Sequence, residues 1–257
     1  MPTKIRVIPT LLFKDVGLVK GVGFDSWRRT GSAMQAIKVY NLREVDELVF
    51  LDITATRDRC PPDFETVDDL ADDCFMPMAV GGGVRMLDHV RRLLMVGADK
   101  VVINTAAVEE PDLIRQAAKR FGAQCVVVSI DARQLSDRSY EVYTHSGTVP
   151  TGREPVSFAR EAESLGAGEI IITSIDRDGT MKGYDLELTR RVSEAVSIPV
   201  IASGGAGNYE HMAQALRFGK ASAIAAASIF HFTEQTPLEA KRYLQQQGFN
   251  MRLPKII

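Results

Sequence analysis

The sequence predicts a (β/α)₈ barrel, an α/β fold in which eight parallel strands alternate with helices and close into a cylinder. Three observations lead to this prediction. The chain has 257 residues, of which 45% are hydrophobic, enough to bury one large core. Short β-branched runs alternate eight times with longer segments of helical periodicity. The two halves of the chain also resemble each other in sequence.

The expected strands are short and almost continuously apolar, as is typical of parallel strands with both faces covered. The segments between them carry apolar residues at i, i+3 and i+4, for example Leu87, Val90 and Leu94. In such a barrel the functional groups lie on the loops after the strands. The expected strands are Ile5 to Leu12, Leu48 to Ile53, Met76 to Val80, Lys100 to Ile103, Cys125 to Ile130, Glu169 to Thr173, Pro199 to Ala202 and Ala223 to Ala227.

The internal similarity places equivalent residues in the two halves. Residues 7–14 align with residues 126–133, and Gly81-Gly82 after the third expected strand aligns with Gly204-Gly205 after the seventh. We therefore expect two similar (β/α)₄ units fused without a linker. The prediction is one domain over residues 1–257, with half-barrels at approximately 1–122 and 123–257.

Composition and charge argue against several classes of protein. Thirty-one Lys and Arg against 33 Asp and Glu give a net charge of −2, too balanced to indicate binding to nucleic acid or to a membrane surface. No apolar run approaches the ~20 residues that span a bilayer, and the N-terminus lacks a signal-peptide core. The three cysteines and four histidines lack disulfide or metal-ligand spacing. We expect a cytoplasmic protein without metal or cofactor.

Two glycine-rich loops, one in each half, are the strongest functional signal. Glycines let backbone N–H groups approach an anion, and each loop opens a helix whose positive end favours phosphate. Each loop has a partner loop after the next strand, so each half can build one phosphate cradle; the alternative is that the glycines only make tight turns. Two cradles indicate a ligand with two phosphate ends. The expected phosphate-binding residues are Gly82, Gly83, Asn104 and Thr105 in the first half and Gly204, Gly205, Ala227 and Ser228 in the second.

Between the cradles, Asp131 at the end of the fifth expected strand is the candidate for acid–base catalysis. Its alternative role is a structural one, capping or pairing with Arg133. The aligned residue in the first half is Leu12, which cannot transfer a proton. The loop after the sixth expected strand adds residues that either bind substrate hydroxyls or order the loop: Asp176, Asp178 and Gly179.

The segment from Lys14 to Ser32 follows the first expected strand and is rich in glycine and charge. We interpret it as a long loop at the C-terminal face. It either closes over the substrate, with Lys20 meeting a phosphate or an intermediate, or is a flexible solvated loop.

Charged residues also occur where apolar packing inside the barrel is expected. They begin or directly precede strands, and two of each sign can form a closed ring near the N-terminal mouth. Burying four charges is costly unless they pair. The ring is therefore either a structural salt-bridge layer or a gate, and its members are Arg6, Glu47, Lys100 and Glu169.

These residues resemble one family closely: the cyclase subunit of imidazole glycerol phosphate synthase, the HisF family of histidine biosynthesis. The resemblance runs almost from end to end of the chain. It implies a barrel that receives ammonia from a HisH-like glutaminase subunit docked at the N-terminal face, where Asp99 is a candidate contact. It also implies that the ring is a gate for this ammonia and that a bisphosphate substrate lies across the opposite face. The matching stretches are residues 46–54, 97–101, 103–107, 130–133, 176–180 and 203–207.

The chain departs from the family pattern at Leu12, where a second catalytic aspartate is expected after a proline, a cysteine and a leucine. Ala79 also replaces a hydroxyl residue of the family. A paralogous branch, used in bacterial surface-polysaccharide synthesis, is similar to this chain at Leu12 and in residues 41–47, 61–65 and 74–78. Its members pass ammonia to a partner that converts an acetamido sugar to an acetamidino sugar.

The sequence therefore favours a HisF-like synthase subunit of a glutamine amidotransferase, specialised for amidino-sugar synthesis of the O-antigen type. The first alternative is the histidine-pathway cyclase itself. The second is a non-catalytic ammonia conduit, or scaffold, whose chemistry takes place on a further subunit.

Overall fold

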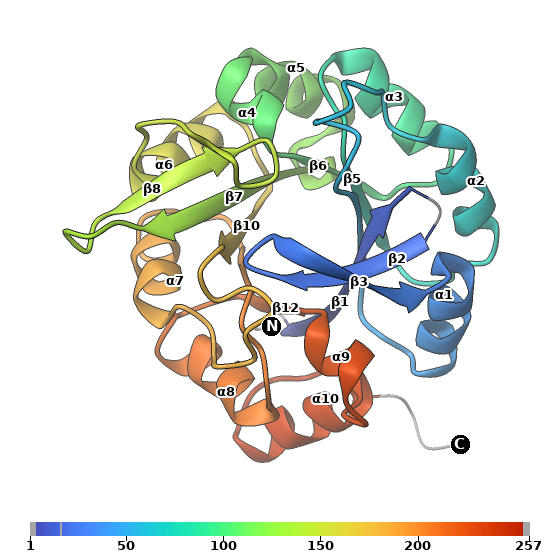
Figure 1. Ribbon diagram of the computed structural model, residues 1–257, viewed down its shortest axis with the longest axis vertical. Coiled ribbons are helices and arrows are strands. Elements are labelled where there is room, and N and C mark those ends of the chain that lie inside the picture. Colours follow the sequence, from blue (N-terminus) through green and yellow to red (C-terminus); the bar gives the residue numbers. More distant parts are fainter. Residues whose placement is uncertain (1–3, 16, 254–257) are drawn as a thin grey trace.

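The computed structural model describes residues 4–15 and 17–253 and shows a closed (β/α)₈ barrel (Figure 1). This confirms the predicted fold class. The parallel strands pair in a ring, and the last of them, β12, pairs with β1 to close it. In order around the barrel they are β1 (Arg6–Lys14), β4 (Leu48–Asp52), β5 (Met78–Gly81), β6 (Lys100–Ile103), β7 (Val126–Gln134), β10 (Glu169–Ser174), β11 (Val200–Ser203) and β12 (Ala223–Ala226).

Helices cover the outside of the barrel (Figure 1). Two of them, α4 and α9, are single short turns that begin directly after β6 and β12. Within the described ranges, no helix combines the length and apolar character that a bilayer crossing requires. The helices are α1 (Ala33–Leu42), α2 (Phe64–Asp72), α3 (Leu87–Met95), α4 (Thr105–Glu109), α5 (Asp112–Phe121), α6 (Pro155–Leu165), α7 (Leu186–Ser193), α8 (Tyr209–Arg217), α9 (Ser228–Phe232) and α10 (Pro237–Gln246), with a 3₁₀ turn, η1 (Ala123–Cys125).

The prediction of a loop from Lys14 to Ser32 is wrong, because most of this segment is a β-hairpin of β2 (Gly17–Val22) and β3 (Asp25–Gly31). β1 runs beyond the barrel and pairs with β2 antiparallel, with Leu12 opposite Val19. Frequent glycines and charges conceal the two-residue period of the strands. The hairpin lies across the barrel mouth (Figure 1), and β2 is largely buried there.

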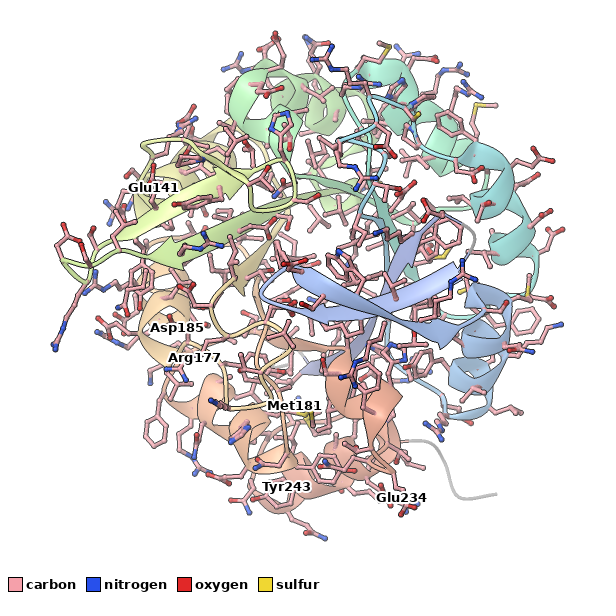
Figure 2. The ribbon with its side chains drawn as sticks, viewed as in Figure 1. Glu141, Arg177, Met181, Asp185, Glu234 and Tyr243 are labelled. Carbon is pink, nitrogen blue, oxygen red and sulfur yellow. The ribbon has the colours of Figure 1, made fainter. Side chains whose placement is uncertain are left out.

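β7 extends beyond the barrel in the same way and pairs with β8 (Tyr140–Thr144), which pairs with β9 (Val149–Pro150). The hydroxyl of Tyr140 donates a hydrogen bond to Oδ1 of Asp185 (3.0 Å) at the start of α7 (Figure 2). Each half of the barrel therefore begins with one long strand whose outer end carries two further antiparallel strands. We call each of these pairs, β2–β3 and β8–β9, a β-excursion. None of the eight strands expected from the sequence covers β8 or β9.

The core is divided between the inside and the outside of the cylinder. Alternate strand residues point inward, where small and branched side chains such as Ile8, Ala79 and Ala225 fill the barrel centre. The remaining strand residues pack against the helices and form a larger cluster, which includes Phe158 and Ile114. This packing fixes the strand ends, and so it positions the groups that those ends carry.

The C-terminal helix is fixed to the barrel by a buried ion pair. Nζ of Lys241 in α10 lies 3.1 Å from Oδ1 of Asp46 and donates a second hydrogen bond to the carbonyl oxygen of Glu44 (2.9 Å). The other oxygen of Asp46 accepts a hydrogen bond from the backbone N–H of Val7 in β1 (3.1 Å). Both side chains are almost completely buried, at 1% and 4% exposure. Asp46 therefore links α10 to β1, and it directly precedes Glu47 in the sequence.

Replacing Lys241 by Met should lower the free energy of unfolding by about 3–5 kcal/mol, because it leaves the Asp46 carboxylate buried without its cation. Urea denaturation of the wild type and the variant measures this difference. The control is Lys119→Met, which removes an exposed lysine of α5 and should change stability by less than about 0.5 kcal/mol. Equal effects of the two substitutions would contradict the structural role of the pair.

Candidate active site

One cavity occupies the C-terminal mouth of the barrel, and every barrel strand or the residues directly after it contribute to its wall. The β2–β3 hairpin adds Lys20, Phe24 and Trp27 to this wall. The sequence-predicted site residues that line the cavity are Leu12, Lys20, Gly82, Asn104, Thr105, Asp131, Asp178, Gly179, Gly204, Gly205, Ala227 and Ser228.

Two predicted site residues do not line the cavity. Gly83 is buried behind it, where an added Cβ would lie 2.6 Å from the carbonyl oxygen of Cys60. Asp176 points away: its carboxylate lies 3.5 Å from Nε of Arg133 and accepts a hydrogen bond from the N–H of Gln134 (2.9 Å). The structure therefore gives Asp176 a local contact with the end of β7. It also pairs Arg133 with Asp176 instead of Asp131.

One glycine of each loop has the same backbone φ, whereas the preceding aligned pair differs, since Gly204 has φ +87° and Gly81 has no positive φ. Gly82 has φ +109° and Gly205 has φ +107°. A Cβ on Gly82 would lie 2.3 Å from the carbonyl oxygen of Asp52, and a Cβ on Gly205 would lie 2.2 Å from that of Gly183. Only glycine fits either position, because the φ is unfavourable for other residues and a backbone oxygen occupies the space. The internal sequence similarity thus corresponds to one shared glycine conformation at the rim, that of Gly82 and Gly205.

The partner loops also match each other. Asn104 precedes α4 and Ala227 precedes α9 with similar backbone angles, and no side chain caps either helix. Oγ of Ser228 is buried and has no hydrogen-bond partner among the described residues. Since buried hydroxyl groups are nearly always hydrogen-bonded, a phosphate oxygen bound at this loop would satisfy it. This geometry supports the predicted phosphate binding at the second cradle.

Asp131 lies within the cavity wall and is buried. Burial is the main cause that raises the pKa of its carboxyl to about 7, and the negative charge of Asp178 adds to this effect. Hydrogen bonds from Thr173, Asn104 and Ser129 oppose the shift; the Asn104 amide donates to Oδ2 at 3.1 Å. A carboxyl with this pKa is present in both protonation states near neutral pH, which suits a group that accepts and returns a proton.

Lys20 and Asp178 form a second charged pair in the cavity. Nζ of Lys20 donates to both carboxylate oxygens of Asp178, at 2.7 and 2.6 Å, and the lysine is only 3% exposed. The N–H of Gly23 donates to the carbonyl oxygen of Asp178 (2.9 Å). The segment after β10, which also carries Arg177 and Met181 (Figure 2), therefore fixes the β2–β3 hairpin over the mouth. A phosphate contact of Lys20 remains a prediction.

The cavity is polar on one side and apolar on the other. Leu12 occupies the place in β1 that Asp131 occupies in β7, and Val49 and Leu51 of the adjacent β4 continue the apolar wall. Asp52, the carboxylate at the end of β4, accepts hydrogen bonds from the N–H and the Oγ1 hydroxyl of Thr54, both at 2.8 Å. Asp52 thus orders the turn after β4.

Sequence reasoning missed several cavity residues. Ser129 and Thr173 are inward-facing polar residues of β7 and β10, and a period of two from Asp131 in the same strand would have indicated Ser129. Phe24 and Trp27 gave no such signal, because they reach the cavity only through the hairpin. Their positions depend on a tertiary contact that the sequence pattern does not show.

The opposite mouth of the barrel carries the predicted ring of four charges. Nζ of Lys100 lies 2.8 Å from Oε1 of Glu47 and 2.9 Å from Oε2 of Glu169, and the Arg6 guanidinium contacts both carboxylates. Each anion therefore contacts both cations. Burial of Glu169 by itself raises the pKa of its carboxyl, but Arg6 and Lys100 outweigh it and hold that pKa below its ordinary value.

Asp99, the predicted contact with a glutaminase, is exposed beside Lys100 at this same face. One of its carboxylate oxygens accepts a hydrogen bond from the N–H of Met78 (2.8 Å). The structure thus places Asp99 at the rim that the resemblance assigns to the partner.

The fold and the site together define a (β/α)₈ barrel with a buried carboxyl, that of Asp131, between two glycine loops at its C-terminal mouth. A comparison with known families agrees with this class: the model of the histidine biosynthesis protein family matches residues 6–236. The chain belongs to this family, which includes the HisF-type cyclases and is typically enzymatic.

The raised pKa of Asp131 predicts a pH-dependent stability. The native state holds this proton up to about pH 7, whereas an unfolded Asp releases it near 3.9. The resulting stabilisation is complete below about pH 4 and is lost as the pH rises through 7. From pH 4 to pH 8 the free energy of unfolding of the wild type should fall by up to about 4 kcal/mol relative to that of Asp131→Asn, at ~1.4 kcal/mol per pKa unit.

Denaturation of both proteins between pH 4 and 8 measures this difference. The control is Asp68→Asn at an exposed position of α2, for which the difference from the wild type should stay nearly constant. A constant difference for Asp131→Asn as well would show that the carboxyl has no raised pKa.

Proposed function

We propose that this chain is a HisF-like synthase subunit of a glutamine amidotransferase, which uses ammonia from a glutaminase partner at its C-terminal mouth. The observation that carries this proposal is the arrangement of two sites at opposite ends of one barrel. A closed ring of charges lies at the N-terminal mouth, and a buried Asp131 lies between two glycine loops at the other. The family match supports a synthase or cyclase role for such a barrel.

In this proposal the two glycine loops bind anionic groups of the substrate through backbone N–H groups. Ammonia attacks an electrophilic carbon held near Asp131. Asp131 transfers two protons in turn from the attacking nitrogen to the carbonyl oxygen, so that the C–O bond breaks with loss of water and a C=N bond replaces it. The Lys20–Asp178 pair holds the hairpin over the mouth and so limits the entry of water.

Leu12 favours a specialised paralogue over the histidine-pathway cyclase. The cavity offers no carboxylate from β1, and Asp52 of β4 is hydrogen-bonded within its own turn. A reaction that needs one acid–base group at the polar side of the mouth fits this arrangement better than one that needs two. We propose the formation of an amidino group on an acetamido sugar, in surface polysaccharide of the O-antigen type.

The purified chain, given ammonium salt and the aminoimidazole bisphosphate of the histidine pathway, should turn over ~10²–10⁴ times more slowly than a cyclase with both aspartates, because one proton-transfer group is missing. Steady-state rates measured side by side test this, and Leu12→Asp should recover part of the deficit. A wild-type rate equal to that of the two-aspartate enzyme would instead identify the chain as the histidine-pathway cyclase.

A non-catalytic conduit makes a different prediction for the complete complex. If the chemistry takes place on another subunit, Asp131→Asn should leave product formation from glutamine unchanged. Under the proposed function it should lower that rate by ~10²-fold or more.

The proposed gate can be tested with Lys100→Met, which leaves Glu47 and Glu169 facing a single cation. If ammonia passes through this ring, the substitution should reduce product formation from glutamine more than from added ammonium, which enters at the open C-terminal mouth. The assay uses the complex with the glutaminase that co-purifies with this chain. Lys100→Arg, which keeps the charge, is the matched control, and equal losses with both nitrogen sources would reject the conduit.

A further inference from the structure

A second hollow adjoins the cavity at the barrel mouth and carries mainly positive charge. Its wall includes several basic side chains and one acidic residue, Glu109. Arg57 and Arg59 come from the loop after β4, Arg85 precedes α3, and Lys14 ends β1. We call this hollow the cationic annex. Its basic residues are Lys14, Arg57, Arg59, Arg85 and His145.

Most of this charge lacks a partner of opposite sign. Arg57 donates two hydrogen bonds to Asp58, and His145 lies 3.7 Å from Glu109. Among the described residues, Lys14, Arg59 and Arg85 form no direct salt bridge, although the charge of Asp58 also acts on Lys14; one N–H of Arg85 donates to the carbonyl oxygen of Arg59 (2.7 Å). Cations gathered around one concave surface repel one another, and the field they produce attracts an anion.

The annex adjoins the barrel cavity. The two share Thr105, which belongs to the first predicted phosphate cradle, and they also share Ile53, Thr56 and Ser146. Ser146 fixes this boundary, because its hydroxyl donates to the carbonyl oxygen of Ile53 (3.0 Å). A ligand that passes over these shared residues can reach both hollows.

Two aromatic rings of the hairpin line both spaces, Phe24 and Trp27. Both are held by glycines: a Cβ on Gly147 would lie 2.8 Å from Cδ2 of Phe24, and a Cβ on Gly21 would lie 3.0 Å from Cε3 of Trp27. The glycines thus allow the rings to pack directly against backbone. A fixed aromatic face beside a cationic surface is suited to a planar ring that carries phosphate.

We propose that the annex is a further anion-binding subsite and that the substrate class is an organic diphosphate ester with a planar ring, such as a nucleoside diphosphate derivative. The ring packs against Trp27 and Phe24, and the diphosphate lies between Thr105 and the arginines of the annex. The remainder of the molecule reaches the barrel cavity and Asp131. This inference rests on the proposed function only in taking that cavity as the substrate site.

The geometry favours a small molecule over an acidic protein segment. Trp27, Phe24 and Thr105 contribute to the wall of an interior cavity as well as to the annex. A docked peptide would contact the exposed arginines without needing the aromatic pair. Binding that depends on both the rings and the charges is therefore the distinguishing property.

The test is equilibrium binding of adenosine diphosphate and uridine diphosphate to the full chain, measured by calorimetry at low ionic strength. Quenching of Trp27, the one tryptophan of the sequence, gives a second readout. Arg59→Gln should weaken the binding of both nucleotides about tenfold, since it removes a charge-assisted hydrogen bond. Arg59→Lys should weaken it less. The matched control, Arg242→Gln on exposed α10, removes the same charge elsewhere and should leave binding unchanged.

Trp27→Leu tests the contribution of the aromatic ring to binding separately from that of the charged side chains. It should weaken the binding of both nucleotides but leave that of inorganic pyrophosphate unchanged. The proposal is overturned if neither nucleotide binds, if Arg59→Gln and Arg242→Gln weaken binding equally, or if a glutamate-rich peptide binds the annex more tightly than the nucleotides. The assay contains no glutaminase and measures no nitrogen transfer, so its outcome and that of the gate test are independent.

Discussion

Closure of the parallel sheet is the constraint on which the rest of the structure depends. Because every barrel strand runs in the same direction, all C-terminal strand ends meet at one rim and all N-terminal ends at the other. Residues as distant in sequence as Leu12 and Ala227 therefore line one cavity. The same constraint gathers Arg6, Lys100 and Glu169 at the opposite rim, where each anion contacts both cations and so offsets the cost of burial.

The duplicated half-barrel explains which parts of the site are symmetric. Gly82 and Gly205 adopt the same backbone conformation against a carbonyl oxygen, and both β1 and β7 extend beyond the rim into antiparallel pairs. Backbone geometry is thus repeated, whereas the side chains at the aligned strand ends differ, with Leu12 in β1 and Asp131 in β7. A barrel can retain two equivalent anion loops while one strand end loses its carboxylate, because the loops depend on backbone shape and the carboxylate depends on one side chain.

The two β-excursions give the site properties that the barrel alone would lack. The Lys20–Asp178 pair fixes the first over the mouth, and this places Trp27 and Phe24 between the barrel cavity and the cationic annex. The excursion after β7 meets it where Gly147 packs against Phe24. The strand ends therefore supply the reacting groups, and the excursions decide how far a ligand can extend.

The sequence by itself determined the barrel, its strands to within a few residues, and part of the cavity lining, because strand periodicity and the internal similarity are local or pairwise patterns. It also indicated the ring of charges, since charged residues at strand starts are conspicuous among apolar neighbours. Only the tertiary structure decided that β2 and β3 form a hairpin and that Asp176 and Gly83 do not line the cavity. Those outcomes depend on contacts between distant segments, Lys20 with Asp178 and Asp176 with Arg133, which no spacing within one segment reveals.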